Sequence, residues 1–299
     1  MVSRIFSQEV RKNAAKNTVP YMFLAPTLFL LLAFLAIPFF SLLWNSVHWT
    51  DLAGVSTFNG LANFRVLLRE DRFLQNILNT LRYMLGVLVI SVPLAYFAAI
   101  LVNSNAKGVG ALRTIFLIPW VIAPVVTALL FKTMLDPRMG PITRLLSWIF
   151  NEPVYLALTM NGARMITIVH SAWRSFPIEM LLISAGMTSI SPELYEASRV
   201  DGASGWDMFR HITLPLTRGP LLSAVLLVSV SCIQESEGVY ALTLGGPGYA
   251  TEVTGVRLFK EAFLYFHISI ASALGVALIC VAIIWMTLYS RVLGKDEGI

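Results

Sequence analysis

Long stretches without any charged residue are the feature that most restricts how this chain can fold. Four of them lie at residues 21–44, 83–106, 114–131 and 262–290. At a rise of about 1.5 Å per residue, the first would reach about 36 Å as a helix. A bilayer core is about 30 Å thick, and only helices and closed barrels satisfy their backbone there. We therefore predict four membrane-spanning helices.

Two further apolar stretches carry charged or strongly polar side chains. Residues 165–190 contain Arg174 and Glu179, and residues 219–244 contain Gln234, Glu235 and Glu237. Charges at membrane depth are tolerated where they face a bundle interior or a water-filled path. Counting both stretches predicts an all-α, polytopic protein with six transmembrane helices. We expect kinks at five prolines, which are Pro38, Pro93, Pro119, Pro124 and Pro177.

The composition supports a membrane protein. Hydrophobic residues make up 57% of the chain and charged residues only 13%, about half of what a soluble domain carries. We attribute the net charge of +5 to contact with lipid headgroups and expect no nucleic-acid partner. The two cysteines, Cys232 and Cys280, lack metal-ligand spacing, so we expect no metal site and read both as core residues.

The pattern predicts a single membrane domain at residues 20–292 between two short tails. We expect residues 1–19 to form a cytoplasmic tail before a retained first helix, because the basic start leads into an apolar run longer than a signal peptide. Residues 293–299 would form a second cytoplasmic tail. Lys and Arg are more frequent on the side of the amino-terminal tail, which favours this orientation weakly.

A polar module at residues 191–215 interrupts the apolar second half. Ser191 and Pro192 are typical of a helix start, and Gly202 and Gly205 can adopt positive φ in the turn that follows. We predict a bent helix–turn–helix along the membrane surface that ends at Leu214–Pro215. Periodicity alone allows two interpretations, an amphipathic connector on lipid or a docking element for a cytoplasmic partner.

The stretch "EASRVDGASGWDMFRHITLP" resembles the signature loop of permease subunits of binding-protein-dependent ABC importers. Ser198 replaces the second alanine of the family pattern and stays small. The segments "LTLGGPGYAT" and "GLANFRVLL" resemble the carbohydrate-uptake branch, similar to maltose and glycerol-phosphate permeases. The residues that match the signature are Glu196, Ala197, Asp201, Gly202, Ala203, Phe209, Ile212, Leu214 and Pro215.

The resemblance implies the six-helix fold of a type I ABC importer permease, in which the module is the coupling helix that inserts into a cytoplasmic ATPase. It implies a second, different permease subunit, two ATP-binding subunits and an external solute-binding protein, in a bacterial inner membrane. The chain has no Gly-x-x-x-x-Gly-Lys-Ser/Thr loop. We therefore expect no catalytic residue here, with ATP and Mg²⁺ bound by the partner ATPase.

Six residues are candidates for the substrate path that the resemblance implies. Carboxylates and amides bind sugar hydroxyls, and an indole can stack on a sugar ring. Two alternatives stay open: Arg174 can pair with Glu179 or another acid, and Glu237 can form a salt bridge or face water. The candidates are Gln234, Glu235, Glu237, Trp173, Arg174 and Tyr240.

Two other classes of function compete with an ATP-driven importer. A stand-alone secondary transporter could carry protons on Glu235 or Glu237. A membrane-embedded enzyme would need clustered His/Asp or Ser/His residues, and we find no such set in the sequence.

Overall fold

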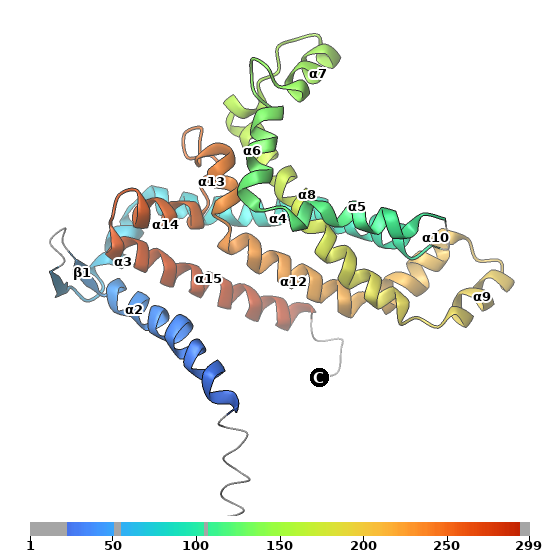
Figure 1. Cartoon of the computed structure of the whole chain (residues 1–299), viewed down its shortest axis with the longest axis horizontal. Helices are drawn as coiled ribbons and strands as arrows, with labels where there is room; N and C mark the ends of the chain where they lie inside the picture. The colour runs from blue at the N-terminus through green and yellow to red at the C-terminus, as the bar shows by residue number, and fades with distance from the viewer. Residues whose placement is uncertain (1–22, 51–54, 105–106, 294–299) are drawn as a thin grey trace, which may run out of the picture.

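The computed structural model describes residues 23–50, 55–104 and 107–293, and it is built almost entirely of helices (Figure 1). Two short strands, β1 (His48–Thr50) and β2 (Ser56–Phe58), pair antiparallel at one end. This confirms the predicted all-α class. The helices are η1 (Leu32–Ala36), α2 (Ile37–Ser46), α3 (Ala62–Arg69), α4 (Asp71–Val102), α5 (Val109–Val121), α6 (Pro124–Met134), α7 (Pro141–Phe150), η2 (Leu156–Leu158), α8 (Met160–Thr188), α9 (Pro192–Val200), α10 (Gly205–Met208), η3 (Phe209–Thr213), α11 (Leu214–Leu216), α12 (Arg218–Gln234), α13 (Glu237–Thr243), α14 (Thr254–Phe263) and α15 (Ile268–Leu293).

Membrane-spanning length and composition are met by three helices of the described chain, Phe23–Ser46, Asp71–Val102 and Ile268–Arg291. Two bent pairs, α5 with α6 and α10–α11 with α12, raise the number to five. Helix α8 has 29 residues, enough to cross a bilayer, but it carries too many polar residues to meet the same composition limit. A sixth span along α8 stays a prediction.

Proline marks the sharpest of these bends. Helices α5 and α6 meet at 95° with Pro124 as the first residue of α6, and Ala123 before it is extended, as a residue preceding proline prefers. Pro93, Pro119 and Pro177 lie inside α4, α5 and α8 without interrupting them. Pro38 lies at the start of α2, directly after the π-helical segment η1.

The centre of the bundle is the pairing of α4 with α8. Gly86 of α4 allows the close approach, because a Cβ there would lie only 2.7 Å from Ile168 of α8. Buried polar side chains add contacts between helices. Ser91 on α4 donates to Glu179 on α8 over 2.9 Å, and Trp285 on α15 donates to Ser229 on α12 over 2.8 Å. Residues 84, 87, 172, 233 and 256 belong to the main apolar core.

The first span contributes little to this core. The most apolar part of Phe23–Ser46 has no buried residue, and Figure 1 shows α2 diverging from the rest of the bundle. Its outward surface is therefore apolar, as a lipid or subunit contact requires. Cys280 on α15 is exposed, contrary to our expectation of a core position, because α15 packs through another face; Cys232 is buried.

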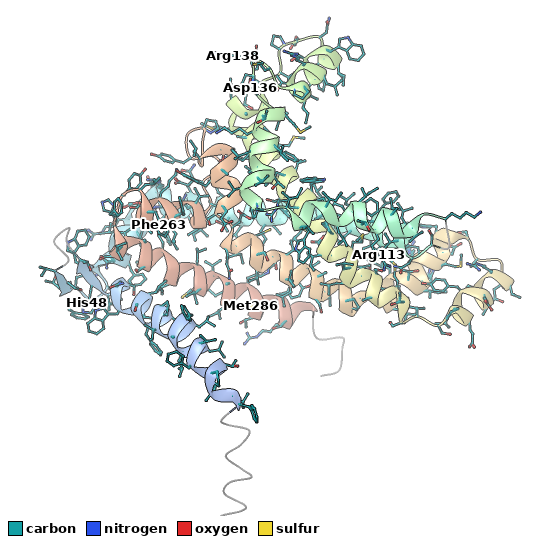
Figure 2. All side chains as sticks on the ribbon, in the orientation of Figure 1. His48, Arg113, Asp136, Arg138, Phe263 and Met286 are labelled. Carbon is teal, nitrogen blue, oxygen red and sulfur yellow. The ribbon has the colours of Figure 1, made fainter. Side chains whose placement is uncertain are left out.

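The two ends of the bundle differ. One end carries α9 and α10 and has Arg113 of α5 nearby; the opposite end carries His48 and Phe263 (Figure 2). Asp136 and Arg138 lie on a lobe formed with α6 and α7 that projects from the side of the bundle. The predicted tail 1–19 lies outside the described residues, as does the predicted tail 293–299 except Leu293.

A buried ionic network closes the end opposite α9. Glu252, fully buried, accepts hydrogen bonds of 2.8 Å from Arg72 and from Lys260, and Asn76 donates to it as well. Burial opposes ionisation of Glu252, but these hydrogen bonds prevail and hold its pKa below the ordinary value. Arg257, only 2% exposed, pairs with Glu70 beside this group. The network links α4, α14 and the segment between α13 and α14.

Candidate functional site

The fifth apolar stretch is a broken helix. Helix α12 ends at Gln234, Glu235 and Ser236 leave the helical conformation, and α13 begins at Glu237. The Glu235 carboxylate then accepts a 2.8 Å hydrogen bond from the Gly238 backbone N–H in the first turn of α13. A negative group there compensates free N–H groups and the positive end of the helix dipole. Glu235 therefore stabilises the break itself.

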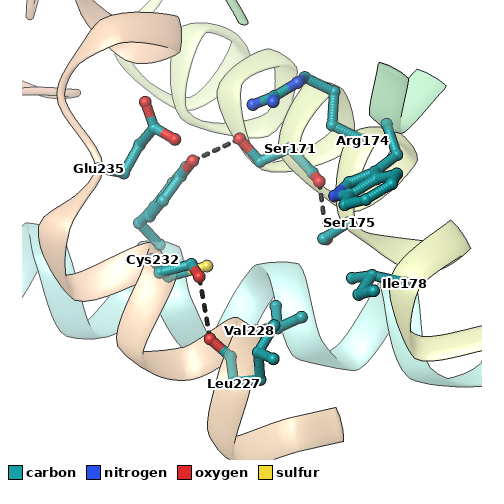
Figure 3. A pocket seen from close by; sticks show the side chains of 11 residues that line it. Ser171, Arg174, Ser175, Ile178, Leu227, Val228, Cys232 and Glu235 are labelled. Carbon is teal, nitrogen blue, oxygen red and sulfur yellow. Dashed lines mark hydrogen bonds between the residues drawn. The ribbon is translucent and has the colours of Figure 1, made fainter. Parts of the chain in front are cut away.

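A polar cavity of about 150 Å³ lies beside this break (Figure 3). It is enclosed by α4, α5, α8 and α12, close to the middle of the long helices. Ser171, Arg174 and Ser175 enter from α8, while Cys232 and Glu235 enter from the other side. The lining residues are Tyr83, Trp120, Ser171, Arg174, Ser175, Ile178, Leu227, Val228, Ser231, Cys232 and Glu235.

Arg174 forms no salt bridge with another described residue, although its charge attracts the Glu235 carboxylate that lines the same cavity. Its Nε is buried without a hydrogen bond, and Glu179 bonds to Ser91 instead. The pairing with Glu179 that we held open from the sequence is not formed. Arg174 as a whole is half-buried, and Glu235 is the one acid that lines the cavity with it.

The module at 191–215 forms the second candidate site. Pro192 begins α9 as predicted, although the Ser191 side chain makes no capping hydrogen bond. Gly202 has φ of +82°, and the Ala203 N–H donates to the Ser198 carbonyl over 2.9 Å, which closes α9 as a Schellman motif. Gly205 instead starts α10, whose first turn is capped reciprocally by Ser204 and Asp207.

The second half of the module runs further than predicted. We expected Leu214–Pro215 to end it, but helix continues to Leu216 before a bend of 68° into α12. The π-helical segment η3 directly before Pro215 accommodates the proline, because Leu214 bonds back five residues to Phe209 rather than four.

The module presents one face outward and anchors the other. Glu196, Ala197, Asp201, Gly202 and Pro215 are exposed, whereas Ser198, Ala203 and Ile212 are half-buried. Val200 and Trp206 are 88% and 67% exposed, and Leu214 is exposed at 37%. Such an apolar patch with acidic residues beside it suits contact with another protein.

The inward face reaches the bundle. Phe209 packs edge-to-face on Tyr96 of α4, with ring centroids 5.7 Å apart. The Tyr96 hydroxyl bonds to Thr217 at the start of α12 over 2.8 Å. Tyr195 of α9 bonds to Thr213 over 3.0 Å. The module is therefore in contact with both α4 and the start of α12.

Comparison with known families decides the identity. Residues 91–293 match the model of the binding-protein-dependent transport system inner membrane component. This chain belongs to that family. The match covers the module and every residue that lines the cavity except Tyr83.

Relatives of the permease align over nearly its whole length. It is 30% identical to the trehalose/maltose transport system permease protein MalF of Thermococcus litoralis, over 91% of this chain and 92% of that one. It is 28% identical to the sn-glycerol-3-phosphate transport system permease protein UgpA of Agrobacterium fabrum, over 89% and 91%. A chain of the bacterial alginate ABC transporter, solved with an alginate pentasaccharide-bound periplasmic protein, superimposes with a TM-score of 0.81 at 25% identity, over 94% and 95%.

The structure places the six substrate-path candidates in different surroundings. Glu235 and Arg174 line the cavity. Trp173 packs against Phe131 at 5.5 Å, and Tyr240 against Phe259 at 4.9 Å, so both rings contact the core. Gln234 and Glu237 are exposed and do not line the cavity.

Our sequence reasoning missed most of the polar groups that line the cavity. The spacing of Ser171, Arg174 and Ser175 places them on one helix face, and Ser231 and Glu235 repeat the same i, i+4 relation. This periodicity could have drawn attention to the serines. Tyr83 and Trp120 lie in apolar runs without any such signal. Tyr83 bonds to Ser171 across the α4–α8 contact.

Proposed function

We propose that this inner-membrane permease passes a sugar or sugar derivative from an external solute-binding protein across the membrane, in an importer driven by ATP. The observation that carries this proposal is the module at 191–215, whose outer face is exposed while Phe209 joins it to α4. The maltose, glycerol-phosphate and alginate systems named above support a carbohydrate substrate.

The remaining parts of the importer are separate chains. A second, homologous permease forms a heterodimer with this one, and two ATP-binding subunits dock beneath the pair. ATP and Mg²⁺ bind to those subunits, so this chain transports and does not hydrolyse. In the membrane, the end with α9 faces the cytoplasm together with both chain termini.

The geometry suggests how ATP binding to the partner subunits changes the cavity in this chain. Closure of the ATP-binding subunits displaces α9, and the contacts of Phe209 and Thr217 with Tyr96 carry the displacement to α4 and α12. Those two helices contribute Tyr83, from α4, and Ser231 and Cys232, from α12, to the cavity. Their movement alternately opens the cavity outward and inward.

Reversing the charge of Glu196 tests the coupling role. In proteoliposomes that contain both permeases, the ATP-binding subunits and the binding protein, we expect Glu196→Lys to reduce ATP-driven uptake at least tenfold. The control is Glu193→Lys on the same exposed helix, which should retain most uptake. Uptake by Glu196→Lys at the wild-type rate would contradict the coupling role.

The same vesicles separate the alternative, a stand-alone transporter coupled to protons. The permease alone should take up no sugar under a pH gradient, because the driving force comes from the ATP-binding subunits. Accumulation by the isolated chain under that gradient would favour the alternative.

A further inference from the structure

A second, smaller cavity continues the path toward the end opposite α9. It measures about 30 Å³ and is lined by Asn79, Arg82, Tyr83, Arg164, Thr167, Ile168, Thr251 and Val253. Tyr83 lines both cavities, so its ring separates them. Arg82 and Arg164 line this smaller cavity, and Arg174 lines the larger one.

One stripe of α8 runs along both cavities. Arg164, Thr167, Ser171 and Arg174 follow one another at steps of three or four residues, and Ser175 comes four residues after Ser171, which keeps all five on one helix face. Arg164 and Arg174 are about 15 Å apart along the helix axis at 1.5 Å per residue. The stripe therefore presents positive charge both at the entrance and in the inner cavity.

The charges that line the two cavities do not balance. Three arginines face them, and Glu235 is the one acid in either lining. Glu235 accepts the Gly238 N–H and also interacts with the charge of Arg174, so Arg82 and Arg164 have no acid beside them in either lining. Arg164 donates to the Ala250 carbonyl over 3.1 Å and to the Asn161 side chain over 3.3 Å, and both acceptors are neutral. Within the described part of the chain, Arg82, Arg164 and Arg174 form no ion pair.

We infer that the solute is a sugar that carries a carboxylate or a phosphate; this inference rests on the proposed function and specifies its substrate. A guanidinium offers a planar fork of donors that matches either anion in a bidentate contact. At membrane depth its charge is costly until an anion arrives, so the arginines favour a charged solute over a neutral one. The Ser175 and Ser231 hydroxyls donate to backbone carbonyls, and those of Tyr83 and Ser171 bond to each other. Their oxygens line the larger cavity and are placed to accept hydrogen bonds from the sugar hydroxyls.

Equilibrium binding to the assembled transporter tests this inference. The complex of both permeases and the ATP-binding subunits is placed in phosphatidylcholine nanodiscs, where no anionic lipid competes. The probes are D-glucuronate, D-glucose 6-phosphate and D-glucose. We expect at least one charged sugar to bind at least tenfold more tightly than glucose, and the better of the two identifies the anion as carboxylate or phosphate.

Variants of Arg174 connect the preference to this site. Arg174→Gln should reduce the preference for the charged sugar at least fivefold, while Arg174→Lys keeps the charge and should retain part of it. Arg138→Gln, which removes a positive charge from the projecting lobe (Figure 2), is the matched control and should change nothing.

Three outcomes would overturn the inference: glucose bound as tightly as the charged sugars, an unchanged preference in Arg174→Gln, or no binding of either charged sugar at millimolar concentration. An acid of the partner permease that neutralises Arg174 would produce one of these results. In each of these outcomes the wild-type transporter would still take up its solute with ATP, and Glu196→Lys would still reduce that uptake. A failure here is therefore distinguishable from a failure of the proposed function.

Discussion

Two glycines of the module at 191–215 illustrate how the need for glycine depends on backbone conformation. Gly202 has φ of +82°, and Gly205 is helical, while neither has an atom within 4 Å of where a Cβ would lie. The difference between them is therefore conformational rather than steric. An L-residue in the left-handed region costs about 1 kcal/mol, and alanine inside a helix costs nothing.

We predict that Gly202→Ala loosens the end of α9. The cost of about 1 kcal/mol corresponds to an approximately fivefold increase in opening. Hydrogen exchange at the Ala203 amide, which bonds to Ser198, should accelerate by that factor. Gly205→Ala is the control and should leave this amide unchanged. Equal exchange in both variants would mean that the Schellman motif contributes nothing to the stability of the module.

Helix α14 depends on close contact with the break between α12 and α13. A Cβ on Gly255 would lie 2.4 Å from the Glu235 carbonyl oxygen and 3.1 Å from that of Gln234. These carbonyls are at the carboxyl end of α12, and only glycine lets α14 approach them. The side of the cavity formed by Glu235 is thus held in place by an element that does not line it.

We predict that Gly255→Ala pushes α14 away and destabilises the permease. Overpacking of this kind costs about 1–3 kcal/mol. Thermal unfolding in detergent should show a Tm several degrees lower than wild type. Gly110→Ala in α5, where nothing lies within 4 Å of the new Cβ, should unfold at the wild-type temperature or slightly above. A wild-type Tm for Gly255→Ala would disprove the tight contact.

At the scale of the whole molecule, Glu252 joins elements that are far apart in sequence. Its carboxylate binds Arg72 and Lys260 while fully buried. Glu252→Gln removes the negative charge and leaves Arg72 and Lys260 without their counter-ion. This should destabilise the fold by about 3 kcal/mol. At pH 7 the variant should unfold at a lower temperature than wild type. Glu193→Gln on the exposed face of α9 should not.

Lowering the pH should remove the difference in Tm between wild type and Glu252→Gln. Because the folded pKa of Glu252 is lowered, its ionised form adds stability above the unfolded value of about 4.3, and that stability is lost as the pH falls through the folded pKa. The Tm values of wild type and Glu252→Gln should therefore converge below about pH 4.3. A constant gap between pH 7 and pH 3 would show that the charge of Glu252 does not contribute.

The local features of this protein follow from its sequence alone. Apolar runs that match the bilayer thickness determine the helical class. The lipid interior offers no hydrogen-bond partners, and a helix pairs its own backbone N–H and C=O groups. The positive φ of Gly202 and the start of α9 at Pro192 follow from neighbouring residues, and the family signature at 191–215 lies within one continuous stretch. Each of these properties depends on residues within a few turns of one another.

Only the tertiary structure decided which polar groups meet. Arg174 and Glu179 looked like partners in sequence, yet Glu179 bonds to Ser91 on another helix, and Arg174 faces a cavity. Glu252 and Arg72 pair although they are far apart along the chain. The ends of α12 and α14 meet because Gly255 allows it. Periodicity orients a side chain on its own helix, but the packing of the other helices determines what it faces.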